Sequence, residues 1–115
     1  MAEYFSRATL SPDSYNSHEW TILHEIKTNT TGALIFDFSI TNTTDNLDIT
    51  VEAKIVDLDG NIVHYILGPT VLKSKGISWD NTQKVVLMPG DKLLVKASDH
   101  GISFYASLLT NLKTL

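Results

Sequence analysis

The strongest constraint on the fold of this chain is the alternation of apolar and polar residues. In residues 33–41 the apolar side chains occupy every second position: Leu34, Phe36, Phe38 and Ile40. In residues 47–57 they do so again: Leu47, Ile49, Val51, Ala53 and Ile55. Successive side chains of a β-strand point to opposite faces, so this period of two predicts half-buried strands with those residues turned toward a core.

Six further segments have strand character: 19–27, 61–67, 70–73, 85–88, 92–98 and 102–109. In the first of them one predicted face carries Trp20, Ile22, His24 and Ile26. In the last, one face carries Ile102, Phe104, Ala106 and Leu108. No segment has the period of a convincing amphipathic helix, so the predicted fold is built of strands alone.

Turn residues separate these segments. Residues 42–46 and the pair Asp59-Gly60 predict turns, and Asp-Gly is a strong signal for a short hairpin. Gly68-Pro69 is expected to interrupt the sheet between 61–67 and 70–73. Pro89-Gly90 suits the centre of a type II turn, which predicts that 85–88 and 92–98 form a core hairpin.

The predicted fold class is all-β, a two-sheet antiparallel β-sandwich of about seven or eight strands. An immunoglobulin-like and a jelly-roll-like topology both fit. A chain of 115 residues favours one domain, here residues 19–115. Residues 1–18 are polar and aromatic without regular period and predict an extended N-terminal arm. Two placements are open for this arm: a neighbour holds it, or it folds back on its own domain.

Composition excludes several classes of function. The net charge of −4 and the lack of a basic stripe argue against nucleic-acid binding. The chain has no Cys, which excludes disulfides, thiolate catalysis and Cys-ligated zinc. No apolar run approaches the roughly 18 residues of a membrane span. The first residues have no apolar stretch of the secretory type.

No arrangement of residues predicts catalysis, a metal site or a cofactor site. The four histidines, His18, His24, His64 and His100, do not show metal-ligand spacing. Residues 57–61, DLDGN, lack the ligand series of a calcium loop and predict a turn. The serines form no nucleophile elbow and the glycines no phosphate cradle. We therefore expect a chain that is not an enzyme.

Four aromatic residues outside the clear strands are candidates for an interface: Tyr4, Phe5, Tyr15 and Trp79. Exposed aromatic side chains anchor interfaces or stack on sugars. Local packing against the sandwich is the alternative for each of them. Trp79 with Asp80 and Asn81 also suits a carbohydrate site, through stacking and hydrogen bonds.

Residues 85–98 resemble a hairpin found in small bacteriophage virion proteins, with the pattern L-x-PGD-x-L-x-V-x-AS. The matching residues are Leu87, Pro89, Gly90, Asp91, Leu93, Val95, Ala97 and Ser98. A looser match follows at Ile102, Phe104, Ala106 and Ser107. The resemblance implies a β-sandwich structural subunit of a phage virion, assembled in the host cytoplasm at the neck, tail or capsid surface. It also implies a homo-oligomer that binds other virion proteins. The alternative is a carbohydrate-binding or receptor-binding module that uses Trp79.

Overall fold

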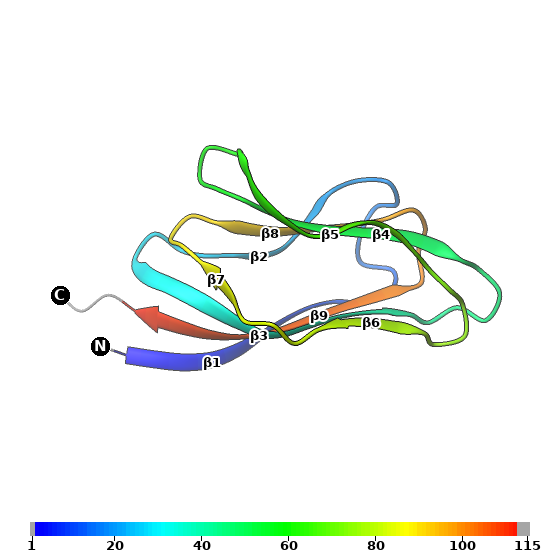
Figure 1. Ribbon diagram of the computed structural model, residues 1–115, viewed down its shortest axis with the longest axis horizontal. Coiled ribbons are helices and arrows are strands. Elements are labelled where there is room, and N and C mark those ends of the chain that lie inside the picture. The colour runs from blue at the N-terminus through cyan, green and yellow to red at the C-terminus, as the bar shows by residue number, and fades with distance from the viewer. Residues whose placement is uncertain (1, 113–115) are drawn as a thin grey trace.

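The computed structural model describes residues 2–112, which fold into two stacked antiparallel sheets (Figure 1). The nine strands are β1 (Ala2–Leu10), β2 (Thr21–Glu25), β3 (Thr30–Asn42), β4 (Ile49–Val56), β5 (Ile62–Leu72), β6 (Ser78–Asn81), β7 (Val85–Leu87), β8 (Lys92–Ala97) and β9 (Ile102–Leu112). The first sheet has the order β1-β9-β3-β6, with β7 also on β3, and is called the β1 sheet. The second has the order β2-β8-β4-β5 and is called the β2 sheet. The predicted all-β sandwich is confirmed.

The strand pairs are nested in the sequence, which selects the jelly-roll-like topology. β1 pairs with β9, β2 with β8, β3 with β6 and β7, and β4 with β5. The chain therefore resembles one long antiparallel hairpin that is wrapped so that its strands alternate between two sheets. β6 and β7 both lie along β3 and together form one interrupted strand of the β1 sheet.

The core lies between the inner faces of the two sheets. Its largest fully buried side chains include Phe38, Ile35, Ile40, Phe104 and Leu108 from the β1 sheet, and Ile49, Val51, Leu93 and Val95 from the β2 sheet. Burying each such side chain contributes roughly 1.5–3 kcal/mol. The predicted inner face of residues 102–109 is confirmed, and so is that of residues 49–55.

The Pro89-Gly90 turn forms as predicted, but it does not join a hairpin. Gly90 has φ 89°, and the Asp91 amide donates to Met88 O across the turn at 3.0 Å. β7 before the turn pairs with β3, whereas β8 after it pairs with β2 and β4. The prediction of a core hairpin over 85–98 was wrong, because the turn carries the chain from one sheet to the other.

A bulge in β3 reverses the predicted direction of two side chains. The register with β9 shifts between Ile35 and Asp37, so that Phe36 is the extra residue. Ile35 and Phe38 are buried, whereas Leu34 and Phe36 lie on the outer face and are only partly covered. The predicted inward face of Leu34, Phe36, Phe38 and Ile40 was therefore half wrong.

β2 and β5 also depart from the prediction because of irregular pairing. A register shift between Ile22 and His24 leaves Ile22 exposed and buries Leu23. β5 continues through Gly68-Pro69, where a further shift lies opposite β4, so the predicted break is absent. Proline is tolerated there because β5 is an edge strand.

The first residues belong to the sandwich. β1 pairs with β9 along its length. Of the two placements considered for residues 1–18, the structure therefore shows the one in which the segment folds back on its own domain. Tyr15, in the connection that follows, is buried between His100 and Phe104. Its hydroxyl donates to Asp99 O at 2.7 Å and accepts from the Ile102 amide at 3.1 Å. The Tyr15 side chain therefore fastens the connection to the start of β9 and is not at the surface.

Replacing Tyr15 with phenylalanine is expected to lower the free energy of unfolding by about 1–3 kcal/mol, because two backbone groups lose their partner. Burial raises the pKa of the Tyr15 hydroxyl above its ordinary value of 10.0. The unfolded chain therefore loses this proton first, and stability falls as the pH rises above 10. Urea denaturation at pH 8 and pH 10.5 measures both effects. The matched control is Tyr65→Phe, at a half-exposed surface tyrosine. Equal losses in the two variants would contradict the role of Tyr15.

Candidate interaction surfaces

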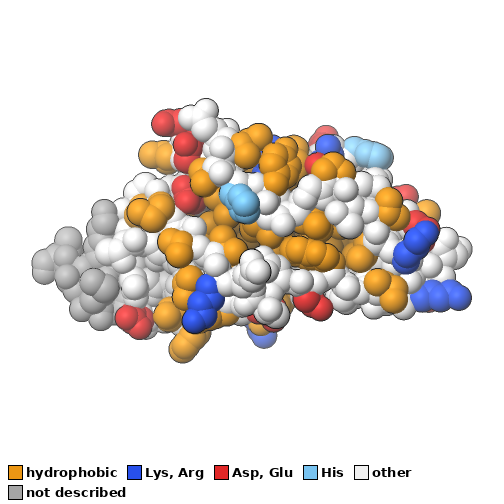
Figure 2. Space-filling model, viewed as in Figure 1, with side chains coloured by type: hydrophobic (Ala, Val, Ile, Leu, Met, Phe, Trp, Pro, Cys, Tyr) orange, Lys and Arg blue, Asp and Glu red, His pale blue; other side chains and the backbone are white. Residues whose placement is uncertain are grey.

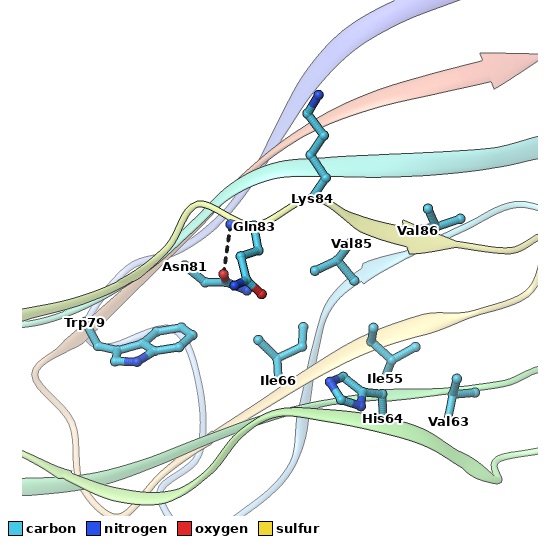
Figure 3. A pocket seen from close by; sticks show the side chains of 10 residues that line it. All are labelled: Ile55, Val63, His64, Ile66, Trp79, Asn81, Gln83, Lys84, Val85 and Val86. Carbon is cyan, nitrogen blue, oxygen red and sulfur yellow. Dashed lines mark hydrogen bonds between the residues drawn. The ribbon is translucent and has the colours of Figure 1, made fainter.

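A groove opens between the two sheets on the side where β5 faces β6 and β7. Figure 2 shows hydrophobic side chains gathered along this hollow. Its volume is about 530 Å³. The lining residues are Ile55, Val63, His64, Ile66, Trp79, Asn81, Gln83, Lys84, Val85 and Val86. In Figure 3, Ile66 and Val85 face each other across the groove and Trp79 lies at one end.

The strand of the β1 sheet that borders the groove is interrupted between β6 and β7. Residues 82–84 separate β6 from β7, opposite the bulge that Phe36 makes in β3. The Gln83 amide donates to Asn81 Oδ1 at 3.0 Å, which fixes the irregular segment locally (Figure 3). This segment contributes Gln83 and Lys84 to the lining of the groove.

The structure brings together only part of the predicted sugar site. Trp79 and Asn81 point into the groove from β6, and the Trp79 ring packs against Phe38 with centroids 5.8 Å apart. Asp80 is exposed on the opposite face of the same strand. Trp79 was expected in an exposed loop segment and is instead a half-buried strand residue.

β5 forms one rim of the groove and is unprotected as an edge strand. It is 11 residues long, and residues 60–72 contain no Asp, Glu, Lys or Arg. Ile62, Val63 and Val71 are each more than half exposed. Of the other outer strands, β1, β2 and β6 carry charged residues, and β7, which carries none, is only three residues long. Long apolar edges without charges pair readily with another chain.

The outer face of the β1 sheet carries an apolar row across four strands. Phe5 pairs with Leu109, Leu109 with Leu34, and Leu34 with Val86. Phe5 is 77% exposed and Val86 65%. Phe36, placed outside by the bulge, packs against Phe5 with ring centroids 5.9 Å apart. Sequence periodicity missed this row because it assigned Leu34 and Phe36 to the core.

Next to the apolar row, the following row of paired residues on the same face carries one positive and one negative side chain. Arg7 pairs with Ser107, and Ser107 pairs with Asp37. Among the described residues, the ion pairs are Lys73 with Asp48 and Lys96 with Glu52. Arg7 and Asp37 thus stand on either side of β9 without forming an ion pair with each other.

A hollow of about 250 Å³ opens at the other end of the apolar row. Its lining includes Gly32, Leu34, Val86, Leu109 and Asn111. Gly32 has φ 129°, and a Cβ there would lie 2.7 Å from Leu87 O. Glycine is therefore required by the backbone at this edge of the hollow.

On the outer face of the β2 sheet, Trp20 is half-buried beneath lysine side chains. Lys54 Nζ lies 4.0 Å from the centroid of the indole ring and Lys96 Nζ lies 5.5 Å from it. Lys96 also contacts Glu52 at 3.6 Å. Trp20, predicted to face the core, instead forms a cation–π cluster on the outside.

Metal sites and membrane-spanning helices are the other features considered for the described residues. Within residues 2–112, no group of three or more His, Cys, Asp or Glu is placed to hold a metal ion. No helix of that part of the chain has the length and apolar character to cross a membrane. His24 is half-buried, and burial lowers the pKa of its imidazole below the ordinary 6.5.

No protein-family model matches the chain, and no curated protein matches its sequence. Solved structures share its fold. A chain of the T13 particle of infectious bursal disease virus superposes with a TM-score of 0.58 at 13% identity, over 96% of this chain and 31% of that one. A chain of the acidic stable capsid of Helicobacter pylori bacteriophage KHP30 gives 0.56 at 12% identity, over 99% of this chain and 90% of that one. A chain of the VP2 subviral particle of infectious bursal disease virus gives 0.55 at 12% identity, over 96% and 32%.

These matches concern the fold. The chain spans about a third of the bursal disease virus chains, 31% of the first. It spans 90% of the phage chain, so those two are similar in length. At identities this low the matches show that the sandwich described above is also the fold of domains in viral capsid structures.

Proposed function

We propose that this chain is a non-enzymatic structural subunit of a bacteriophage particle. The observation that carries the proposal is the match to the phage KHP30 capsid structure, in which a chain of similar length has a similar fold over 90% of its residues. The resemblance of residues 85–98 to small phage virion proteins points the same way. The neck, the tail and the capsid surface are the candidate positions.

The surface of the chain supports a role in assembly. β5 offers a long uncharged edge, and the groove beside it offers apolar side chains from both sheets. Added strands are a common way for one chain to bind the edge of another. We therefore assign this side of the sandwich to contact with a neighbouring virion protein.

The N-terminal segment takes part in assembly through its outer face. Because β1 is paired with β9, it does not extend toward a neighbour in this structure. It presents Phe5 and Arg7 on the outer face of the β1 sheet, and Phe5 is 77% exposed. Tyr15 has no such role, because its side chain is buried.

The test is mass spectrometry of gradient-purified particles of the virus that encodes the chain, followed by incorporation of tagged variants. The chain is expected in the particles at a copy number set by particle symmetry. Val63→Lys places a charge on the β5 edge and is expected to reduce incorporation at least about tenfold, or about 1.4 kcal/mol. Asn46→Lys, at an exposed turn away from the groove, is the control and is expected to incorporate normally.

One outcome would contradict the structural role, and a different outcome would contradict the assignment of β5 as the contact. Absence of the chain from purified particles would overturn the structural role. Equal incorporation of the Val63 and Asn46 variants would leave the structural role intact and remove β5 as the contact.

The second candidate function is carbohydrate or receptor binding. It is favoured by one observation, that Trp79 shares the 530 Å³ groove with the polar side chains of Asn81, Gln83 and His64. Aromatic rings beside polar groups suit a saccharide. A glycan array with wild-type chain and Gln83→Ala separates the candidates, since saccharide binding that Gln83→Ala abolishes supports the module.

A further inference from the structure

The outer face of the β1 sheet is complementary to itself. β1 and β3 flank β9 on opposite sides, and neighbouring strands lie about 4.8 Å apart. A two-fold axis parallel to β9, lying in the plane of contact, exchanges the two sides. The rotation leaves each residue at the same height along the strand direction. In such an arrangement β1 of one copy faces β3 of the other, row against row.

We propose that a second copy of this chain binds here, face to face, about that two-fold axis. The proposal goes beyond the proposed function and does not depend on it. Stacked sheets normally keep their strand directions within about 30° of each other, which this arrangement satisfies. Two-fold dimers are also the commonest symmetric assembly of identical chains.

The charges of the face support this partner. Arg7 and Asp37 lie in the same cross-strand row, one strand on each side of Ser107. The two-fold axis brings Arg7 of each copy opposite Asp37 of the other, so the contact contains the same ion pair twice. Arginine binds a carboxylate through two parallel N–H donors, which fixes orientation as well as adding affinity.

The apolar row supports the same axis. Phe5 and Leu34 lie in one row on either side of Leu109, so each Phe5 faces Leu34 of the second copy. Leu34 lies in the 250 Å³ hollow beside Gly32 and Val86. The most exposed large apolar side chain of the face therefore meets a hollow on the second copy, and exposed aromatic residues of this kind are typical anchors.

The area of the outer face determines how stable we expect the dimer to be. Four strands span about 14 Å, and nine residues of β1 span about 30 Å, which gives a contact on the order of 400 Å² per copy. Stable interfaces bury about 800 Å² per partner. We therefore expect a reversible dimer that forms at high concentration, as in a particle lattice, and dissociates on dilution.

Sedimentation velocity of the full chain between about 1 and 200 µM tests the proposal. Wild type is expected to pass from monomer to dimer over this range. Arg7→Asp and Asp37→Arg each place like charges opposite each other twice, and each is expected to weaken the dimer about tenfold or more. Phe5→Ser is expected to weaken it similarly. Lys27→Asp, an exposed charge reversal off this face, is the control and is expected to dimerise as wild type does.

A mixture of the two charge variants gives the decisive result. When Arg7→Asp and Asp37→Arg chains are combined, both ion pairs form across the contact with reversed or native polarity, and a heterodimer is expected at wild-type strength. The double variant is also expected to dimerise. A wild-type chain that stays monomeric at 200 µM, an assembly larger than a dimer, or a mixture that fails to associate would overturn the proposal. Thermal melting of each variant shows that the monomer is folded. None of these outcomes depends on finding the chain in virus particles.

Discussion

Replacing Asn42 with alanine is expected to lower the free energy of unfolding by about 3 kcal/mol or more. The Asn42 side chain is fully buried where β3 ends. Its Nδ2 donates to Leu47 O at 2.8 Å and to Leu72 O at 2.9 Å. Its Oδ1 accepts from the amide and the hydroxyl of Thr44, at 3.0 and 2.7 Å. Each buried group left without a partner costs about 1–3 kcal/mol, and alanine leaves several.

The loss of the Asn42 side chain affects more than the turn over residues 42–46. Leu72 ends β5 in the β2 sheet, whereas Asn42 ends β3 in the β1 sheet, so the bond to Leu72 O joins the two layers. Urea denaturation followed by tryptophan fluorescence measures the loss. The matched control is Asn46→Ala, an exposed asparagine of the same turn, which is expected to change stability by less than about 0.5 kcal/mol. A similar small change in both variants would show that the buried network is not needed.

The fold class followed from local pattern, and the pairing of strands did not. Alternation in residues 49–55 and 102–108 identified inner faces correctly, because the extra residues of the neighbouring bulges lie in the partner strands β5 and β3. The Pro89-Gly90 turn was also located correctly. Its conformation is a local property, whereas the sheet that each flanking strand joins depends on distant residues. Ile26 of the β2–β3 connection, for example, exchanges backbone hydrogen bonds with Gly90 and Asp91.

The surfaces were predicted least well, for one physical reason. A bulge inserts a single residue and reverses every side chain that follows it relative to a strict period of two. Such shifts in β2 and β3 moved Ile22, Leu34 and Phe36 to the outside. Of the four aromatic candidates, Phe5 lies on an exposed face, Tyr4 is partly exposed, Trp79 is half-buried in the groove and Tyr15 is buried. Isolated aromatic residues carry no sequence signal that separates these outcomes.

The bulge in β3 leads to the second large expected effect, a contrast between two neighbouring phenylalanines. Phe38 has no exposed surface and packs against Trp79 in the core. Phe38→Ala is expected to lower the free energy of unfolding by about 3–5 kcal/mol, because it removes buried apolar surface and leaves a cavity. Phe36 lies on the outer face against Phe5, where solvent fills the space that a shorter side chain leaves. Phe36→Ala is expected to cost about 1 kcal/mol or less.

Chemical denaturation of both variants at about 1 µM measures this contrast, since self-association through the outer face does not contribute at that concentration. The two residues have the same chemistry and are two positions apart, so a regular strand would place them on one face and make the two losses equal. A large loss in Phe38→Ala alone is the result expected if Phe36 is the extra residue of the bulge, out of register between Ile35 and Asp37. The same insertion places Phe36 beside Phe5 and creates the apolar row on the outer face. One pair of measurements therefore tests both the core and the origin of the surface that we assign to the second copy.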